Sequence, residues 1–351
     1  MLLTPGPVEL APEINRAQTR KLIHHRTPEY REMHKRIVGM AREFFGSDEA
    51  YVITGSGTAG LEAGIASLAN EKDSIFIPHN GKFGERLVEI SKVFCPKVVA
   101  KKFEYGKGIN LERVKAEIDA AKPTMVAFVY CETSTGVSNR AKEIAAYAKK
   151  SGALVFVDAV SAAGGHEFDA KGWGVDYVVT GSQKALGAPP GLALVGLNKE
   201  ALAKIASNSP KAYYLDLRKF AKAQDKWETP DTPAVTLMYS LEEALDIAFR
   251  EGIAKRIERH RKAGEMVRRR LGEMGFTMFA EKGYESNTVT AFKVASPEQE
   301  ERIRKGLLKE EDILISGGQG EMKGKILRIG HMGNFRQEDL ERCLNAIGRL
   351  K

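Results

Sequence analysis

Short apolar runs alternate with segments of helical periodicity over the first two thirds of the chain. The apolar runs predict strands, which lie at 50–54, 74–78, 98–103, 124–130, 153–159, 176–180 and 192–197. Apolar residues at helical spacing predict helices at 58–69, 82–94, 111–121 and 140–150. Continuous apolar strands separated by helices are typical of a parallel sheet that is covered on both faces. We therefore predict an α/β fold with a mostly parallel, seven-stranded sheet sandwiched by helices.

The pattern changes after Pro233. Helical spacing continues over 236–274 and predicts one long helix that bridges two parts of the chain. Three further strands and two further helices follow, with strands predicted at 288–294, 312–316 and 325–330 and helices at 297–309 and 336–350. This order of strands and helices predicts a smaller α+β domain at the C-terminal end. We expect a large domain over 1–240, with an N-terminal arm at 1–20, and a small domain over 241–351.

The composition is that of an ordinary globular protein, with 43% hydrophobic and 28% charged residues. The three cysteines, Cys95, Cys131 and Cys343, are too scattered to suggest a disulfide framework or a metal site. No apolar run approaches the roughly 20 residues of a membrane helix, and the first residues do not resemble a signal peptide. We expect a cytoplasmic protein with no bound metal and no membrane contact.

The net charge of +8 is concentrated in a basic stretch from Lys255 to Arg270. A nucleic-acid patch is one interpretation of this stretch. The solvated face of a long helix is the other, and we favour it because glutamates are interspersed and no aromatic residues accompany the cations. No nucleic-acid partner is expected.

Two charged residues lie where predicted strands end: Asp158 closes an apolar strand, and Lys184 follows the next one. Ligands of open parallel sheets bind outside the carboxyl ends of the strands, so both side chains are expected in one crevice. A lysine amine there can condense with the aldehyde of pyridoxal phosphate (PLP), and a carboxylate can keep the pyridine nitrogen protonated. The freed amine can then move the substrate Cα proton.

Either residue alone is more often structural, as a surface lysine or a helix cap. Small residues around Lys184 favour the pair, since they let a ligand approach.

A glycine-rich turn joins the strand at 50–54 to the next helix, and its Gly55, Gly57 and Gly60 fit G-x-G-x-x-G. Backbone N–H groups at such a helix start bind anions, and the hydroxyls of Ser56 or Thr58 can add to them. The same motif suits a nicotinamide-dependent dehydrogenase, which is the rival interpretation. That rival expects an acidic residue at the end of the following strand, which instead ends in Pro78-His79-Asn80-Gly81.

Two further strand ends carry candidate cofactor contacts. Phe83 follows the strand at 74–78, and its ring could stack on a cofactor; a core aromatic is the alternative. Thr133 and Ser134 follow the strand at 124–130, and their hydroxyls could bond a cofactor oxygen; a local Ser/Thr turn is the alternative.

Taken together, these segments resemble the class V aminotransferases of PLP fold type I. The resemblance is strongest to the alanine/serine–glyoxylate aminotransferases and the small prokaryotic aspartate aminotransferases, and it runs along essentially the whole chain. It is carried by TPGPV, HHRTPEY, TGSGTAGLEA, NGKFGER, CETSTGV, VDAVS, GSQKALGAPPG, YYLDL, TPAVTLMYSLEEAL and GGQGEMKGKILRIGHMG.

The resemblance implies a role for individual residues. Lys184 is implied as the Schiff-base lysine and Asp158 as the pyridinium partner, while Val160 would pack on the ring opposite Phe83. Thr133 would bond the ring hydroxyl, and Arg328 would clamp the substrate carboxylate. The remaining implied contacts are the phosphate ligands Ser56, Gly57, Thr58 and Gln183, the partner-subunit phosphate ligand Thr232, and Gly6 of the arm on the substrate side.

Some positions differ from the family pattern or are ambiguous. Phe83 stands where glyoxylate-type members often carry tryptophan, and Thr229 stands where some relatives have a phosphate-binding tyrosine. His25 and Arg26 of HHRTPEY could bind the side chain of a dicarboxylate substrate. The alternative for Arg26, which we favour, is a salt bridge with Glu29 or Glu32.

The function implied is a ping-pong transaminase, active on alanine, serine or aspartate with glyoxylate, pyruvate or 2-oxoglutarate, and working as a homodimer with shared sites. A class V lyase such as a cysteine desulfurase is disfavoured, because the loop at 317–325 has no cysteine. A dehydrogenase using GSGTAG and a non-catalytic binding protein are the remaining alternatives.

Overall fold

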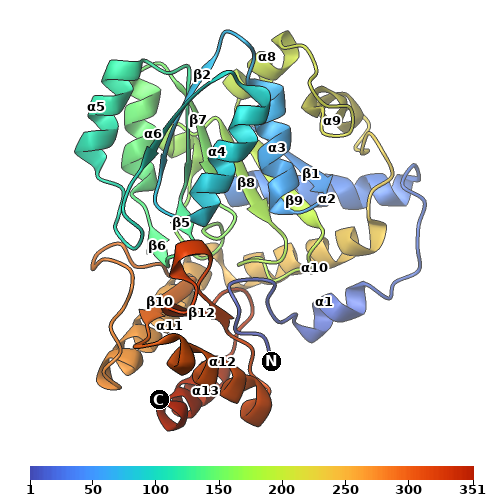
Figure 1. Ribbon diagram of the computed structural model, residues 1–351. Coiled ribbons are helices and arrows are strands. Elements are labelled where there is room, and N and C mark those ends of the chain that lie inside the picture. Colours follow the sequence, from blue (N-terminus) through green and yellow to red (C-terminus); the bar gives the residue numbers. More distant parts are fainter.

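The computed structural model, which covers residues 1–351, consists of a large sheet flanked by helices and a smaller sheet with its own helices (Figure 1). The seven strands of the large sheet are β1 (Glu49–Thr54), β2 (Ser74–His79), β3 (Lys97–Lys102), β4 (Met125–Val129), β7 (Leu154–Asp158), β8 (Tyr177–Gly181) and β9 (Leu192–Leu197). Each lies within one or two residues of the run that predicted it.

The strand order of the large sheet is β1-β9-β8-β7-β4-β2-β3. Neighbouring strands from β8 to β3 are parallel, whereas β9 is antiparallel to both β1 and β8. The predicted mostly parallel seven-stranded sheet is confirmed. Alternate residues of each strand enter different cores: Val155 and Val157 of β7 pack in one cluster, and Phe156 packs in the other.

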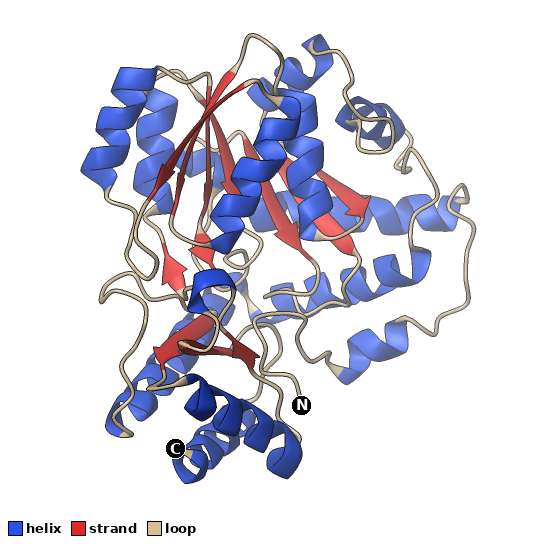
Figure 2. Cartoon of the chain, in the orientation of Figure 1, coloured by secondary structure: helices blue, strands red, loops and turns tan.

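Helices cover both faces of this sheet, as Figure 2 shows in blue around the red strands. One face carries α3 (Gly57–Leu68), α4 (Lys82–Phe94), α8 (Lys199–Ser207) and α9 (Leu217–Gln224). The other carries α2 (Pro28–Phe45), α5 (Leu111–Ala121), α6 (Ala141–Lys150) and the short α7 (Ala170–Trp173).

Helix α2 was missed by the sequence analysis, although its ends are clearly marked. Thr27 accepts a hydrogen bond from the Tyr30 amide as N-cap, Pro28 occupies the first helical position, and Gly46 closes the helix with φ of +65°. Its buried face, which includes Tyr30, Ile37 and Phe45, packs into the same core as β7.

The smaller sheet has the antiparallel order β10-β12-β11, with strands β10 (Val289–Lys293), β12 (Ile326–Gly330) and β11 (Ser316–Gly317). Helices α11 (Ile253–Glu273), α12 (Pro297–Glu311) and α13 (Gln337–Leu350) pack around it. The strand predicted at 312–316 is therefore mostly wrong. Its residue Leu314 instead forms a bridge with Leu2, so the N-terminal arm adds to this part of the molecule. No helix is both long enough and apolar enough to cross a membrane.

The single helix predicted over 236–274 is wrong, since two helices occupy this stretch. Helix α10 (Val235–Glu251) ends at Gly252, whose φ of +84° is open to glycine, and α11 starts at the next residue. Helix α10 packs on α2 and on α1 (Pro12–Ala17), whereas α11 packs on α13 and β10. The domain division at residue 240 stays a prediction.

Two short strands, β5 (Cys131–Glu132) and β6 (Val137–Ser138), and the 3₁₀ turn η1 (Gly320–Met322) lie where the two parts meet. The C-terminal ends of the central parallel strands point toward this junction, and the N-terminal arm crosses it (Figure 1). In a sheet of this kind, that is where a ligand site is expected.

Candidate active site

A cavity of about 280 Å³ lies at the carboxyl ends of the central strands. Its size is close to the lower end of the range for small-molecule sites, roughly 300 Å³. The cavity brings together ten predicted site residues, namely Gly6, Ser56, Gly57, Thr58, Phe83, Thr133, Asp158, Val160, Gln183 and Lys184. Four residues that had no assigned role complete the lining: Arg86, Val129, Cys131 and Ser161.

Asp158 is the last residue of β7 and is only 3% exposed. One of its carboxylate oxygens accepts a hydrogen bond from the Val160 amide at 2.9 Å. Burial raises the pKa of Asp158, while the positive charges of Arg86 and Lys184 and the Val160 amide act in the opposite direction. The carboxylate is thus held in a buried place where a cation is its natural partner.

Lys184 lies in the turn that follows β8, and its side chain reaches the same cavity. Its amine donates a hydrogen bond to the carbonyl of Pro5 in the N-terminal arm. Burial lowers the pKa of Lys184 to about 8; the positive charges of Arg328 and Arg86 add to this effect, and Asp158 opposes it. A depressed pKa makes the neutral, nucleophilic amine available near neutral pH.

The start of α3 forms the opposite wall. Ser56 is the N-cap residue, but its side chain makes no capping hydrogen bond, so its hydroxyl is not consumed by the helix. The first N–H groups of a helix lack partners within the helix and favour an anion. Gly57 leaves no room for a side chain, because a Cβ there would lie 2.8 Å from a methyl group of Val160. Gln183 also lines the cavity, and its buried Oε1 has no hydrogen-bond partner.

Phe83 and Arg86 lie one turn apart on α4 and both line the cavity. The Arg86 guanidinium lies 4.7 Å from the centre of the Phe83 ring, and its buried Nε has no hydrogen-bond partner. The Lys184 amine is 5.9 Å from the same ring centre. From the sequence, only Phe83 of this segment was predicted to lie in the site. The spacing of three residues, which places two side chains on one helix face, was the available signal for Arg86.

Glu132, which is fully buried, holds this segment in place. Its carboxylate accepts hydrogen bonds from the amides of Phe83 at 3.1 Å and Gly84 at 2.9 Å, and from the Ser134 hydroxyl at 2.5 Å. Burial raises the pKa of Glu132, and these donors oppose that rise. The Ser134 hydroxyl also accepts a hydrogen bond from the Lys82 amide at 3.0 Å, so it serves the protein's own structure through these contacts and not through a local Ser/Thr turn. Thr133 faces the cavity, where its hydroxyl lies 2.5 Å from that of Ser161.

Arg328, on β12, approaches the cavity without lining it. Its guanidinium donates to the carbonyl oxygens of Gly317 at 2.8 and 3.0 Å and of Thr133 at 3.1 Å. It is 4% exposed and borders a second cavity of about 810 Å³, which also includes Thr4 and Gly317. Burial lowers the pKa of Arg328 to about 10. Arg328 thus lies next to Thr133, which lines the smaller cavity.

The other predicted residues lie elsewhere in this chain. Arg26 donates to Glu228 at 2.7 Å and to the Thr229 carbonyl at 2.8 Å, so the predicted salt bridge with Glu29 or Glu32 is wrong. The partner is 202 positions away, which local spacing cannot show. Thr229 and Thr232 line a separate small pocket, and His25 lines neither of the two cavities described above.

The residues of the smaller cavity fit PLP. The protonated pyridine ring of PLP is flat and cationic. The carboxylate of Asp158 suits its charge, and the side chains of Phe83 and Val160 suit its flat faces. The phosphate group of PLP suits the start of α3, whose N–H groups favour an anion. Gln183 lines the same cavity, and its buried side-chain oxygen has no protein partner. An aldehyde is matched by the amine of Lys184.

Comparison with known proteins gives a consistent picture. The family model described as Aminotransferase class-V matches residues 13–342. An uncharacterized aminotransferase of Methanocaldococcus jannaschii is 36% identical, covering 99% of this chain and 91% of that protein. The (S)-ureidoglycine–glyoxylate transaminase of Bacillus subtilis is 31% identical over 95% of this chain and 85% of its own length.

The fold comparison agrees with the sequence comparison. The crystal structure of an alanine–glyoxylate aminotransferase from Nostoc sp. superposes with a TM-score of 0.95 at 29% identity, covering 99% of this chain and 94% of that one.

Proposed function

The chain belongs to the class V aminotransferase family, and on that premise we propose that it binds PLP beside Lys184 and moves an amino group from a small amino acid to a 2-oxo acid. One observation carries the proposal: the amine of Lys184 and the carboxylate of Asp158 line the same cavity, next to the start of α3. Family membership removes the support for the dehydrogenase interpretation of the glycine-rich turn.

PLP supplies an aldehyde that joins covalently to amines and a ring that accepts electrons from the substrate Cα. Lys184 provides the amine that anchors the aldehyde carbon, and its lowered pKa supports this role because the attacking form is neutral. When the substrate amine takes its place, the Nζ atom is free to accept the Cα proton and to return it. Asp158 holds a proton on the ring nitrogen by its negative charge.

The remaining wall residues orient the ring. Phe83 and Val160 would enclose the two faces of the ring, and the hydroxyl of Thr133 would bond the ring hydroxyl. The phosphate would be held by Ser56, Gly57, Thr58 and Gln183, which line the same cavity. Arg86 contributes a positive charge near Asp158, which favours the ionised carboxylate.

Arg328 binds the substrate carboxylate in this proposal. Its guanidinium has the planar donor geometry that suits a carboxylate, and its carbonyl contacts fix its direction. The proposed substrates are small: alanine, serine or aspartate as donor, and glyoxylate, pyruvate or 2-oxoglutarate as acceptor. Glyoxylate ranks first, because it appears in the names of two of the relatives reported above.

A homodimer with shared sites completes the proposal. Thr229 and Thr232 lie away from the chain's own cavity, which supports a contact with the phosphate of a second subunit. The three cysteines are free and buried. They support a reducing, cytoplasmic location, and none is available as the mobile nucleophile of a desulfurase.

The test is a panel of amino donors against glyoxylate, pyruvate and 2-oxoglutarate, with the PLP-loaded protein. We expect transfer from at least one small donor, with two-step ping-pong kinetics, and no transfer by Lys184→Ala. Absence of transfer from every donor, in a protein that holds PLP, would contradict the substrate class. Failure to hold PLP would contradict the cofactor.

A further inference from the structure

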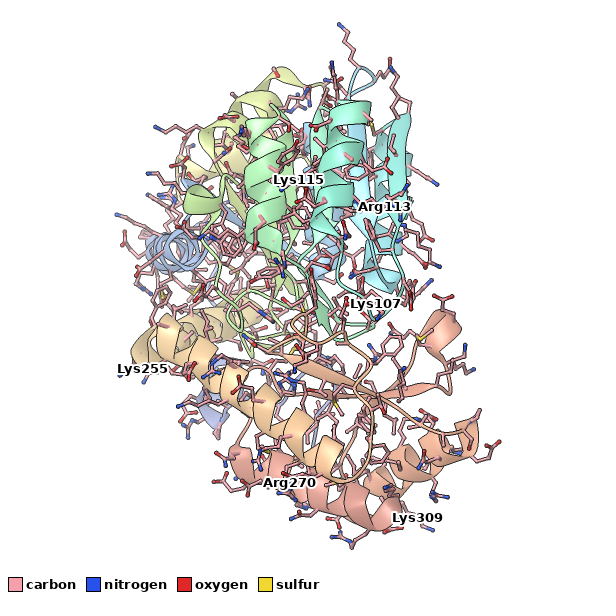
Figure 3. The ribbon with its side chains drawn as sticks, turned by 90° about the vertical axis from the view of Figure 1, so that its left-hand side faces the viewer. Lys107, Arg113, Lys115, Lys255, Arg270 and Lys309 are labelled. Atoms are coloured by element: carbon pink, nitrogen blue, oxygen red, sulfur yellow. The ribbon has the colours of Figure 1, made fainter.

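The basic stretch singled out in the sequence is helix α11, with Lys255 and Arg270 toward its two ends (Figure 3). Along its exposed face, cations pair with neighbouring carboxylates: Arg261 with Glu258 at 2.7 Å, and Arg269 with Glu273 at 3.2 Å. That agrees with the solvated helix face that we expected. Arg256 differs from these exposed cations, because its side chain is only 1% exposed.

Arg256 reaches the loop that carries Lys184. Its Nη2 atom donates to the carbonyl oxygens of Ala185 at 2.8 Å and Leu186 at 3.4 Å, the two residues that follow Lys184. The same atom lies 3.1 Å from Oδ1 of Asn334. Backbone carbonyls in a buried loop need donors, and a guanidinium can serve several at once in a fixed geometry.

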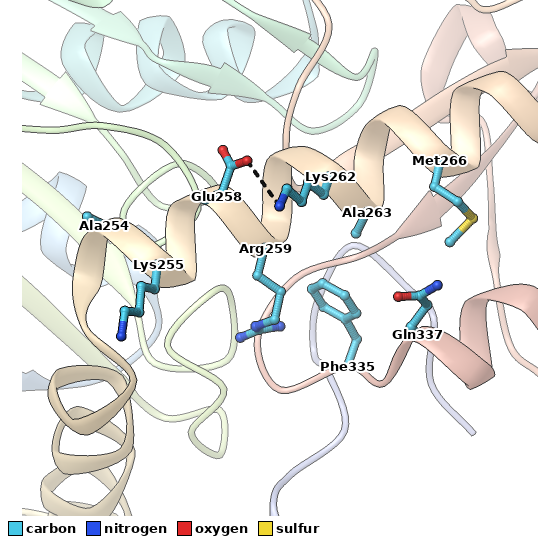
Figure 4. Close-up of a pocket in the computed structure, with 9 residues that line it drawn as sticks. All are labelled: Ala254, Lys255, Glu258, Arg259, Lys262, Ala263, Met266, Phe335 and Gln337. Atoms are coloured by element: carbon cyan, nitrogen blue, oxygen red, sulfur yellow. Dashed lines mark ion pairs between the residues drawn. The ribbon is translucent and has the colours of Figure 1, made fainter.

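Glu251 neutralises this buried cation. Its carboxylate accepts from Nη1 of Arg256 at 2.6 Å and from Nε of Arg259 at 2.6 Å. Arg259 in turn donates to the Gly333 carbonyl at 3.1 Å. Figure 4 shows Arg259 beside Phe335, and its guanidinium lies 4.7 Å from the centre of that ring.

The segment that follows β12, with Gly333 and Asn334, packs against the loop that carries Lys184. A Cβ on Gly333, whose φ is +77°, would lie 3.3 Å from the carbonyl oxygen of Lys184. One on Gly187, with φ of +74°, would lie 2.7 Å from the side-chain nitrogen of Asn334. The Lys184 loop is thus packed against this segment and hydrogen-bonded to α11, both of which come from the C-terminal part of the chain.

We propose that the Glu251–Arg256 ion pair is a positioning device that fixes the backbone at Ala185 and Leu186 and thereby aims the Lys184 amine into the cofactor cavity. Glu251 ends α10 and Arg256 lies in the first turns of α11, so the pair also spans the break at Gly252. A buried ion pair adds little stability by itself and is better suited to selecting one geometry. The inference rests on the proposed role of Lys184.

The positive charges that lower the pKa of Lys184 most strongly are those of Arg328 and Arg86. Removing Arg256 should therefore change how the lysine is held while leaving the charges nearest to its amine in place.

The first measurement is amide hydrogen exchange over residues 182–192, with and without PLP, in Arg256→Met and in the matched control Arg261→Met. Methionine fills much of the space of arginine without donating hydrogen bonds. We expect loop exchange to rise about tenfold or more in Arg256→Met, as loss of a charge-assisted hydrogen bond predicts. In Arg261→Met, which contacts only α11 carboxylates, it should stay at the wild-type rate.

The second measurement separates positioning from general destabilisation. In the PLP-loaded enzyme, kcat of Arg256→Met should fall by up to about 100-fold, the cost of misplacing a catalytic group by about 1 Å, with KM much less affected. Arg256→Lys keeps the charge but cannot serve Glu251 and both carbonyls together, so it should recover only part of kcat.

Unchanged loop exchange in folded Arg256→Met, or an equal rise in Arg261→Met, would overturn the proposal. If Arg256→Met does not fold, Arg256→Lys and Glu251→Gln are judged by the same two criteria. Loop exchange without PLP does not depend on catalysis. The positioning role of the Glu251–Arg256 pair can therefore be disproved while PLP still binds Lys184. Conversely, the proposed function can be disproved while the pair still fixes the loop.

Discussion

Gly6 lies so close to Lys184 that a methyl group on its Cα would be 2.6 Å from Cδ and 2.9 Å from Nζ of the lysine. The two residues are far apart in the chain, and they meet because the N-terminal arm contributes Gly6 to the lining of the cavity that Lys184 also lines. The backbone at Gly6 has φ of +94°, a conformation that favours glycine. The arm is therefore part of the wall that Lys184 faces.

We expect Gly6→Ala to impair cofactor capture. The added methyl group displaces the lysine side chain, and a non-glycine residue at this φ costs about 1–3 kcal/mol. PLP titration of the purified variant should give a dissociation constant at least about tenfold higher than that of the wild type. Gly39→Ala is the matched control, because nothing lies within 4 Å of a Cβ at that helical position. Equal PLP affinity in the wild type and Gly6→Ala would contradict the close approach.

Arg86→Met should move the pH dependence of PLP capture. Capture requires the neutral amine, so its rate rises with pH and levels off above the pKa of Lys184, about 8. Arg86 lowers this pKa by its charge, and its removal therefore shifts the curve to higher pH.

The rate of PLP capture can be followed by absorbance between about pH 6 and 10, a range that brackets the lysine titration. Arg113→Met removes a cation that lies over a different ring, that of Phe103, and should leave the curve in place. A curve for Arg86→Met that moves to lower pH, or does not move, would show that this arginine does not act on the lysine.

Arg328→Lys tests the proposed binding of the substrate carboxylate by Arg328. A lysine keeps the charge but loses the paired donors and the contacts to Gly317 and Thr133. Since hydrogen bonds to charged groups contribute about 1.5–3 kcal/mol, kcat/KM should fall roughly ten- to a hundredfold. PLP affinity should change little. Arg302→Lys, at an exposed contact with the chain's C-terminal end, is the control. A variant with full kcat/KM would assign this binding to another residue.

The sequence predicted which residues meet in the cavity better than it predicted the residues that support them. Asp158 and Lys184 follow apolar strands, and the rule that parallel strands end at one edge was sufficient to bring them together. Arg256 was not predictable in the same way, because a buried arginine in a basic helix has the same local pattern as its exposed neighbours. The break at Gly252 was missed because a single glycine does not interrupt helical periodicity.

Arg26 illustrates a related limit of the sequence. Its contacts with Glu228 and the Thr229 carbonyl join segments about two hundred residues apart, and no spacing rule relates them. Helix α2, by contrast, could have been predicted: Thr27-Pro28 and Gly46 are ordinary start and stop signals that were not used.

Arg26→Ala should leave the ratio of aspartate to alanine turnover unchanged. The guanidinium is engaged by Glu228 and by backbone carbonyls, so its loss should cost stability, on the order of 1 kcal/mol for a partly exposed pair, and not substrate preference. Steady-state rates with both donors and a thermal melt are the measurements. A selective loss of aspartate turnover would instead support a dicarboxylate contact.

Borohydride reduction of the protein incubated with PLP, followed by peptide mass spectrometry, tests the central claim most directly. Reduction makes the bond between a lysine amine and the cofactor permanent, so the labelled peptide reports which lysine holds it. We predict the PLP mass on the peptide containing Lys184 and no incorporation in Lys184→Ala. Stable labelling of a different lysine, or none in a folded protein saturated with PLP, would contradict the assignment of this cavity as the active site.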